Sequence, residues 1–213
     1  MTKSALIFWG GWDGHTPDRS AAIVADMLAR HGFAVDVQQG TGCLAAPDLG
    51  RHDLIVPMIT MSTIEKDELA GLTAAVRAGT GLAGAHGMMC DAFRNETEYQ
   101  FMTGGQWVSH PGNIIDYTVN VTSDDPIVAG LGDFAYRSEQ YYMHVDPSNR
   151  VLATTTFTGD HLADVAGVVM PVVWTRHYGK GRVFYSALGH TADEFAVPQM
   201  ATIFERGALW AAR

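Results

Sequence analysis

The chain has 213 residues, of which 47% are apolar and 17% are charged, and its formal charge at pH 7 is −9. This composition excludes a disordered chain, and the presence of two cysteines alone, Cys43 and Cys90, excludes a disulfide framework. The acidic balance argues against a nucleic-acid partner, and the absence of a long apolar run argues against a membrane partner. Unpaired thiols and a start that does not resemble a signal peptide predict a cytoplasmic protein.

The first half of the chain has the pattern of a parallel sheet covered by helices. Thr16 and Pro17 predict the start of a helix that ends near Gly32, and Ser62 with Glu65 fits the capping box of a second helix. Continuous apolar runs predict the strands, which are residues 4–9, 33–37, 53–59 and 81–85. This order predicts right-handed crossovers and a doubly wound sheet.

The second half changes to alternating apolar and polar residues, which is typical of antiparallel strands. Alternation occurs in residues 114–121, 135–144 and 151–157, and glycines at 179 and 181 predict a hairpin. Pro198 begins the last helix. We therefore predict a single domain over residues 1–213, of the α/β class, with a mainly parallel sheet and antiparallel additions in its second half.

Histidines recur in glycine-rich segments, three of which directly follow predicted strands. These three segments carry His15, His86 and His190, and two further segments carry His110 and, after Glu139, His144. Because the carboxyl ends of parallel strands line the ligand crevice of an open sheet, we expect His15, His86 and His190 to converge. A loop that holds His110 can fold over the same edge.

His86 lies in the sequence Gly84-Ala85-His86-Gly87, which is similar to the strand–turn–helix elbow of hydrolases. An imidazole at the elbow suits a general acid, a general base or a metal ligand, and not a stable acyl carrier. We predict that the ring faces an open cleft. The alternative is a hydrogen-bonded bystander in a turn whose glycines pack helix against sheet.

Histidine and carboxylate together suit a divalent metal such as zinc or manganese, for which His15, His110 and His144 are candidate ligands. Glu139 and His144 are five residues apart, so on one strand they point to opposite faces unless a turn intervenes. The alternative is acid–base chemistry without a metal, with His86, His190 and Glu139 as catalytic residues. No nucleotide cofactor is expected.

Aromatic residues in the same loops predict a sugar-binding surface. Trp12 and Trp107 each lie in a glycine-rich loop beside a histidine, where an indole plane can stack on a sugar ring. Asp13 and Tyr141 complete the candidate substrate-binding set. The other histidines are interpreted as surface or strand residues, and the methionines as gap-filling core residues: His31, His52, His161 and His177, with Met58, Met61, Met88, Met89 and Met102.

Taken together, these motifs resemble the ThuA-like, or trehalose-utilisation, family. The resemblance rests on residues 10–17, 84–87, 105–112 and 189–195, and it extends over nearly the whole chain. The family is similar in fold to class I glutamine amidotransferases, so the resemblance implies a flavodoxin-like three-layer sandwich. It also implies that His86 takes the position of the elbow cysteine and His190 that of the catalytic histidine. The resemblance also implies that Glu139 and Tyr141 fall where the family has a segment similar to acidic-x-x-Tyr.

The resemblance implies a role in carbohydrate catabolism that passes through 3-keto sugars, with a small-molecule sugar as the partner. The first hypothesis is therefore an enzyme that isomerises or eliminates a 3-keto sugar or glycoside by histidine acid–base chemistry, with or without a metal. The alternatives are a non-catalytic sugar-binding or regulatory module and a metal-dependent hydrolase. Glutamine amidotransferase activity is disfavoured because the elbow lacks cysteine. An antiparallel hairpin at the edge of the sheet can pair with a second copy of the chain, so the sequence is compatible with a homo-oligomer.

Overall fold

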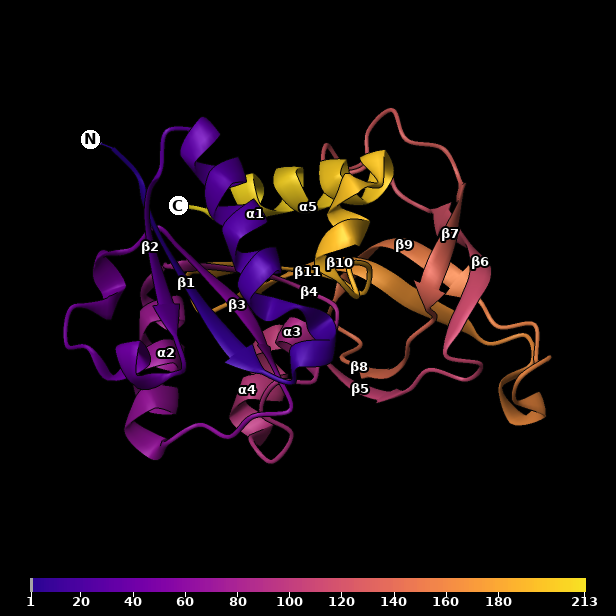
Figure 1. Ribbon diagram of the computed structural model, residues 1–213, viewed down its shortest axis with the longest axis horizontal. Helices are drawn as coiled ribbons and strands as arrows, with labels where there is room; N and C mark the ends of the chain where they lie inside the picture. Colours follow the sequence, from indigo (N-terminus) through magenta and orange to yellow (C-terminus); the bar gives the residue numbers. More distant parts are fainter. Residues whose placement is uncertain (1) are drawn as a thin grey trace.

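The computed structural model describes residues 2–213 (Figure 1). The helices are α1 (Pro17–Arg30), α2 (Lys66–Ala78), α3 (Gly87–Cys90), α4 (Thr97–Thr103) and α5 (Pro198–Ala211). The strands are β1 (Ser4–Gly11), β2 (Ala34–Gln39), β3 (Leu54–Thr60), β4 (Gly81–Ala85), β5 (Gly105–Ser109), β6 (Ile114–Val121), β7 (Phe134–Glu139), β8 (Tyr142–Val145), β9 (Arg150–Thr156), β10 (Val169–Tyr178) and β11 (Gly181–Ser186). Each helix within residues 2–213 is too short or too polar to cross a bilayer.

A nine-stranded mixed sheet has the order β2-β1-β3-β4-β11-β10-β9-β6-β7 in the part of the chain that is described. Neighbours from β2 to β11 are parallel, and neighbours from β11 to β7 are antiparallel. Strand β5 pairs with β8 apart from this sheet. The predicted α/β class and the antiparallel additions are therefore confirmed. Gly179, with φ of 61°, makes the tight hairpin between β10 and β11.

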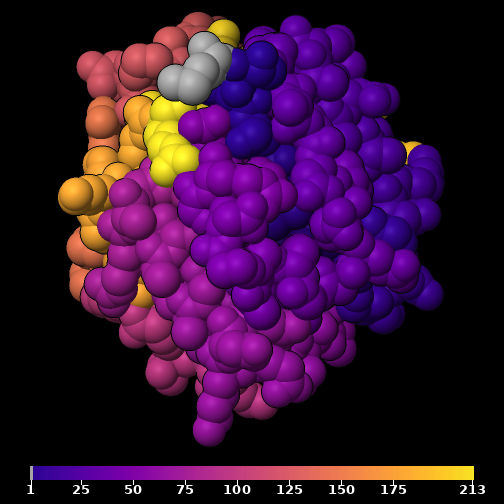
Figure 2. All heavy atoms as spheres, turned by 90° about the vertical axis from the view of Figure 1, so that its left-hand side faces the viewer, coloured from indigo at the N-terminus to yellow at the C-terminus, as the bar shows by residue number. Residues whose placement is uncertain are grey.

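Helices cover both faces of the sheet, as expected of a three-layer sandwich. Helices α1 and α5 pack on one face and α2, α3 and α4 on the other (Figure 1). Helix α1 buries Val24 and Leu28, whereas Ile23, one residue off that stripe, remains exposed. Helix α5 buries Ile203 and Phe204. Figure 2 shows the end of the sheet at β2, whose surface is formed mainly by the N-terminal half of the chain.

The second helix begins one turn later than the sequence predicts. The backbone N–H of Glu65 donates to Glu68 Oε2 at 2.9 Å, so Glu65 is the N-cap, and Ser62 lies outside the helix. The reason is a tertiary contact: the backbone N–H of Ser62 donates to the carbonyl of Ala92, which holds this segment extended beside the turn after α3. A local capping signal cannot report such a contact.

Candidate metal centre and adjoining pocket

His86 occupies a strained turn between β4 and α3, as the elbow pattern predicts. Its φ of 51° and ψ of −146° are unusual for a residue with a side chain, and its N–H donates to Ser186 at 2.7 Å. The prediction that its ring faces an open cleft is wrong. The side chain is 0% exposed because the ring of Tyr141 stacks on it, with 3.9 Å between the ring centroids.

Four side chains from distant segments meet at this turn: His15, His86, Glu139 and His190. His15, His86 and His190 follow β1, β4 and β11, which are parallel strands, so the expected convergence is what the fold produces. Glu139 is the last residue of β7, so it reaches the cluster from the antiparallel half of the sheet. One donor atom from each residue lies within 4.8 Å of all the others.

The donor atoms have the spacing that a shared ion requires. His86 Nε2 lies 3.0 Å from Glu139 Oε2, and His190 Nδ1 lies 3.3 Å from His86 Nε2 and 3.4 Å from Glu139 Oε2. Tetrahedral ligands with bonds of about 2.0–2.1 Å are roughly 3.3 Å apart. Three imidazoles and one carboxylate are an ordinary donor set for zinc, manganese or iron.

The protonation of His86 makes the case for a cation stronger. Its Nδ1 lies 2.8 Å from the carbonyl oxygen of Ala187, and a carbonyl accepts only, so Nδ1 carries the proton. A neutral ring then directs the Nε2 lone pair at the Glu139 carboxylate, which is repulsive unless a proton or cation lies between them. Burial lowers the pKa of His86 despite the carboxylate, which favours the neutral ring.

The neighbouring donors are also held in their metal-binding forms. Burial, together with the nearby His86, lowers the pKa of His15 to about 2, and His15 Nδ1 lies 2.8 Å from Thr60 Oγ1. Burial alone would raise the pKa of Glu139, but the adjacent His190 and His86 leave it below its usual range. His15 and His86 are therefore neutral imidazoles near neutral pH, and Glu139 is an ionised carboxylate.

A second acidic residue, Glu194, fixes the loop that carries His190. Its Oε2 accepts the backbone N–H of His190 at 2.9 Å and the hydroxyl of Tyr136 at 2.6 Å, while Oε1 accepts the hydroxyl of Ser138 at 2.8 Å. Glu194 thus ties the end of β11 to β7, the strand that carries Glu139. Such support determines where a ligand side chain points.

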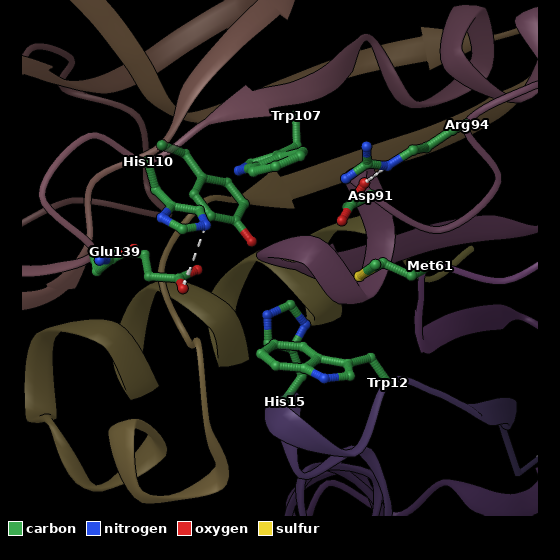
Figure 3. A pocket seen from close by; sticks show the side chains of 10 residues that line it. Trp12, His15, Met61, Asp91, Arg94, Trp107, His110 and Glu139 are labelled. Carbon is green, nitrogen blue, oxygen red and sulfur yellow. Dashed lines mark hydrogen bonds and ion pairs between the residues drawn. The ribbon is translucent and has the colours of Figure 1, made fainter. Parts of the chain in front are cut away.

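A cavity of about 380 Å³ opens beside the cluster (Figure 3). Trp107 and Trp12 lie on opposite sides of it, and His110 lies at its edge, with Nε2 3.7 Å from Glu139 Oε1. Glu139 therefore borders both the cluster and the cavity. The cavity is lined by Trp12, His15, Met61, Asp91, Arg94, Trp107, His110, Asn113, Glu139 and Tyr141.

Two candidate site residues lie away from the cluster and the cavity, and two other residues differ in burial from what the sequence predicts. His144 lies on β8 paired with Gln106 and is exposed, because strand alternation turns Met143 inward instead. Asp13 is exposed and lies outside the cavity lining. Met61, expected in the core, is 61% exposed at the cavity, while His52, expected at the surface, is buried.

Sequence reasoning did not single out Asp91, Arg94 and Asn113, which also line the cavity. Asp91 and Arg94 follow α3, the short helix that begins after His86. The rule that loops at strand ends carry ligands therefore applies to them as well. Neither residue is a histidine or lies in a glycine-rich segment, which are the features that mark the other site residues in the sequence.

Comparison with known proteins shows the family. The sequence profile of ThuA, described as trehalose utilisation, matches residues 4–211. The chain belongs to the ThuA family. No curated protein matches the sequence.

Solved structures show the same fold. A ThuA-like protein of Parabacteroides merdae is 20% identical with a TM-score of 0.78, and the match covers 99% of this chain and 89% of that one. A ThuA-like protein of Bacteroides uniformis is 19% identical with a TM-score of 0.79, over 98% and 91% of the two chains. A β-galactosidase of Rahnella sp. R3 is 21% identical with a TM-score of 0.59, over 99% of this chain and 30% of the enzyme.

Proposed function

We propose that this member of the ThuA family is a carbohydrate-catabolic enzyme that binds a divalent ion, zinc or manganese, and converts a 3-keto sugar or its glycoside. His15, His86, Glu139 and His190 would hold the ion. The observation that carries the proposal is the 3.0 Å approach of His86 Nε2 to Glu139 Oε2, with the His86 proton committed to Ala187. The family description and the indole-walled cavity support a sugar as the substrate.

A bound ion of this kind acts as a Lewis acid that polarises a carbonyl oxygen. A keto group acidifies the neighbouring C–H bond, and a positioned base then removes that proton, giving isomerisation or elimination. We assign this proton transfer to His110, which is half-buried at the cavity. His86 is enclosed and uses both ring nitrogens within the protein, so it cannot reach a substrate.

Two alternatives are tested by the same assay. Hydrolysis at the same site would release a free sugar instead of an isomer or an unsaturated product. A sugar-binding module would hold the sugar unchanged. Amidotransferase chemistry is disfavoured, since the elbow side chain is an imidazole, and burial raises the pKa of Cys90, the nearest thiol along the chain.

The test combines metal analysis of untagged protein with turnover of methyl 3-keto-glucoside followed by NMR, before and after chelation. We expect His86→Ala and His190→Ala to lose both the ion and turnover, and His110→Ala to lose turnover while keeping the ion. His177→Ala, an exposed histidine on β10, is the matched control and should change neither. A folded His86→Ala variant with a full complement of metal would overturn the proposal.

A further inference from the structure

Asp91 and Arg94 form an ion pair in the wall of the cavity, on the side away from Glu139 (Figure 3). The Asp91 side chain is 6% exposed, and the Arg94 Nε–H donates to its Oδ1. Arg94 also lies over the ring of Trp107, 4.5 Å from the ring centroid. The pair is therefore held in place by an aromatic plane as well as by its own charges.

The second oxygen of Asp91 points into the cavity (Figure 3), and within residues 2–213 Arg94 is the one side chain that hydrogen-bonds this carboxylate. Burial raises the pKa of Asp91, and the Arg94 guanidinium offsets this only in part. This oxygen faces the cavity and receives no donor from the described residues, so the position favours a ligand that brings hydrogen-bond donors.

The rest of the cavity indicates what carries those donors. Trp12 and Trp107 offer flat apolar surfaces on opposite sides, and the lining between them includes the polar side chains of Asp91, Asn113 and Glu139. A molecule with apolar C–H faces and a rim of hydroxyl groups matches both features. A ligand carboxylate in the same place would meet the Asp91 oxygen and be repelled.

We infer that Asp91, positioned by Arg94, binds the hydroxyl groups of a neutral pyranose ring and excludes uronic acids. This inference rests on the proposed function in one respect, namely that the substrate enters this cavity. A variant without the Asp91 charge is predicted to favour an acidic sugar more than the wild type does. If Asp91 loses its charge, Arg94 stays on Trp107 without a counter-charge and favours a ligand carboxylate.

The experiment titrates methyl β-glucoside and methyl β-glucuronide into the protein by calorimetry, with tryptophan fluorescence as a second readout. Neither sugar is a keto sugar, so binding is measured without turnover. We expect the wild type to prefer the glucoside. Asp91→Asn should bind the glucoside at least about tenfold more weakly, as for a lost hydrogen bond to a charged group, and should bind the glucuronide more tightly than the wild type does.

Two further variants separate this effect from a general loss of structure. Arg94→Gln should weaken glucoside binding less than Asp91→Asn and should gain no affinity for the glucuronide. Asp48→Asn removes the charge from another ion pair of the same i,i+3 spacing, with Arg51 at the surface, and should leave both affinities unchanged.

The inference is overturned if the wild type binds neither sugar, or binds both equally, or if Asp91→Asn binds the glucoside as the wild type does. Metal content measured on the same samples keeps the two proposals apart. Protein that selects the neutral sugar but holds no ion would refute the metal-dependent function alone. Protein that holds the ion but shows no selectivity would refute the role of Asp91 alone.

Discussion

The histidine cluster and the cavity wall beside it are built in different ways. In the cluster, His86 is 0% exposed and is fixed by its own turn and by the Ala187 carbonyl, whereas Trp12 in the wall is 48% exposed. The first region depends on backbone positions that four strands set together, and the second includes side chains, such as Trp12, that are half-exposed to solvent. We therefore expect small changes near the cluster to be costly and changes in the wall to affect ligands alone.

The largest effect is expected for Gly87→Ala, at the residue after His86. An added Cβ would lie 2.5 Å from His15 Cε1 and 2.8 Å from the Tyr141 hydroxyl, so two buried rings would have to move. We expect zinc affinity, measured by calorimetry, to fall by roughly 10–100-fold, the range seen when the supports of metal ligands are altered. Overpacking should also destabilise the fold by about 1–3 kcal/mol.

Gly132→Ala is the control for this change, because a Cβ at Gly132 meets no atom within 4 Å. It should leave zinc affinity and thermal unfolding unchanged. Unaltered zinc binding in folded Gly87→Ala protein would contradict the view that the cluster has no freedom to adjust.

A smaller effect is expected for Glu194→Gln, because Glu194 contacts the candidate ligand residue His190 and would not itself contact the ion. The amide can accept on one side only, so either the His190 N–H or the Ser138 hydroxyl loses its acceptor. We expect about a tenfold loss of zinc affinity, the lower end of such effects. Asp193→Asn is the control, since Asp193 is an exposed residue paired with Arg19; equal losses in both variants would count against a positioning role for Glu194.

In the cavity wall, Trp12→Ala should separate ligand binding from stability. Loss of the indole is expected to weaken glucoside binding about fivefold or more, as for an aromatic anchor worth at least 1 kcal/mol. Unfolding free energy should stay within about 0.5 kcal/mol, because Trp12 is 48% exposed and lies outside the hydrophobic core. Phe101→Ala, at an aromatic residue of similar exposure outside the cavity, should change neither quantity. A matching loss of zinc in Trp12→Ala protein would erase the distinction between the two regions.

The sequence was sufficient for the parallel half of the fold and for the meeting of His15, His86 and His190. Both follow from continuous apolar strands and from the rule that parallel strands end at one edge. The β4 prediction, residues 81–85, matches the observed strand, Gly81–Ala85. These features are local patterns combined with one topological rule, so they can be read along the chain.

What the sequence could not supply depends on distant contacts. The enclosure of His86 comes from Tyr141, which arrives on the connection after β7, and nothing near residue 86 encodes it. Likewise, the outward direction of His144 follows from how β8 pairs with β5. The pairing of Asp91 with Arg94 could be read from the chain, but its position in the cavity could not.

The smallest effect of zinc is expected at the two thiols, because Cys43 lies outside both regions and Cys90 lies beside the cluster without belonging to it. Burial raises the pKa of Cys43 to about 11, so at pH 8 only about one thiol in a thousand is ionised. Its alkylation by iodoacetamide should therefore rise about tenfold per pH unit up to pH 11, because only the thiolate reacts. Cys43 lies apart from the cluster, and zinc should not change this rate.

Cys90 should respond differently to the same reagent. It ends the helix that His86 begins, its N–H donates to the His86 carbonyl, and it is buried, so labelling requires that segment to open. An ion bound by His86 stabilises the closed form alone and should slow Cys90 labelling several-fold. Mass spectrometry of the two peptides measures both rates in one sample. A ligand that binds only the closed turn must reduce the population of the open one. Equal labelling rates at Cys90 with and without zinc would therefore mean that ion binding at the cluster does not stabilise the turn at His86.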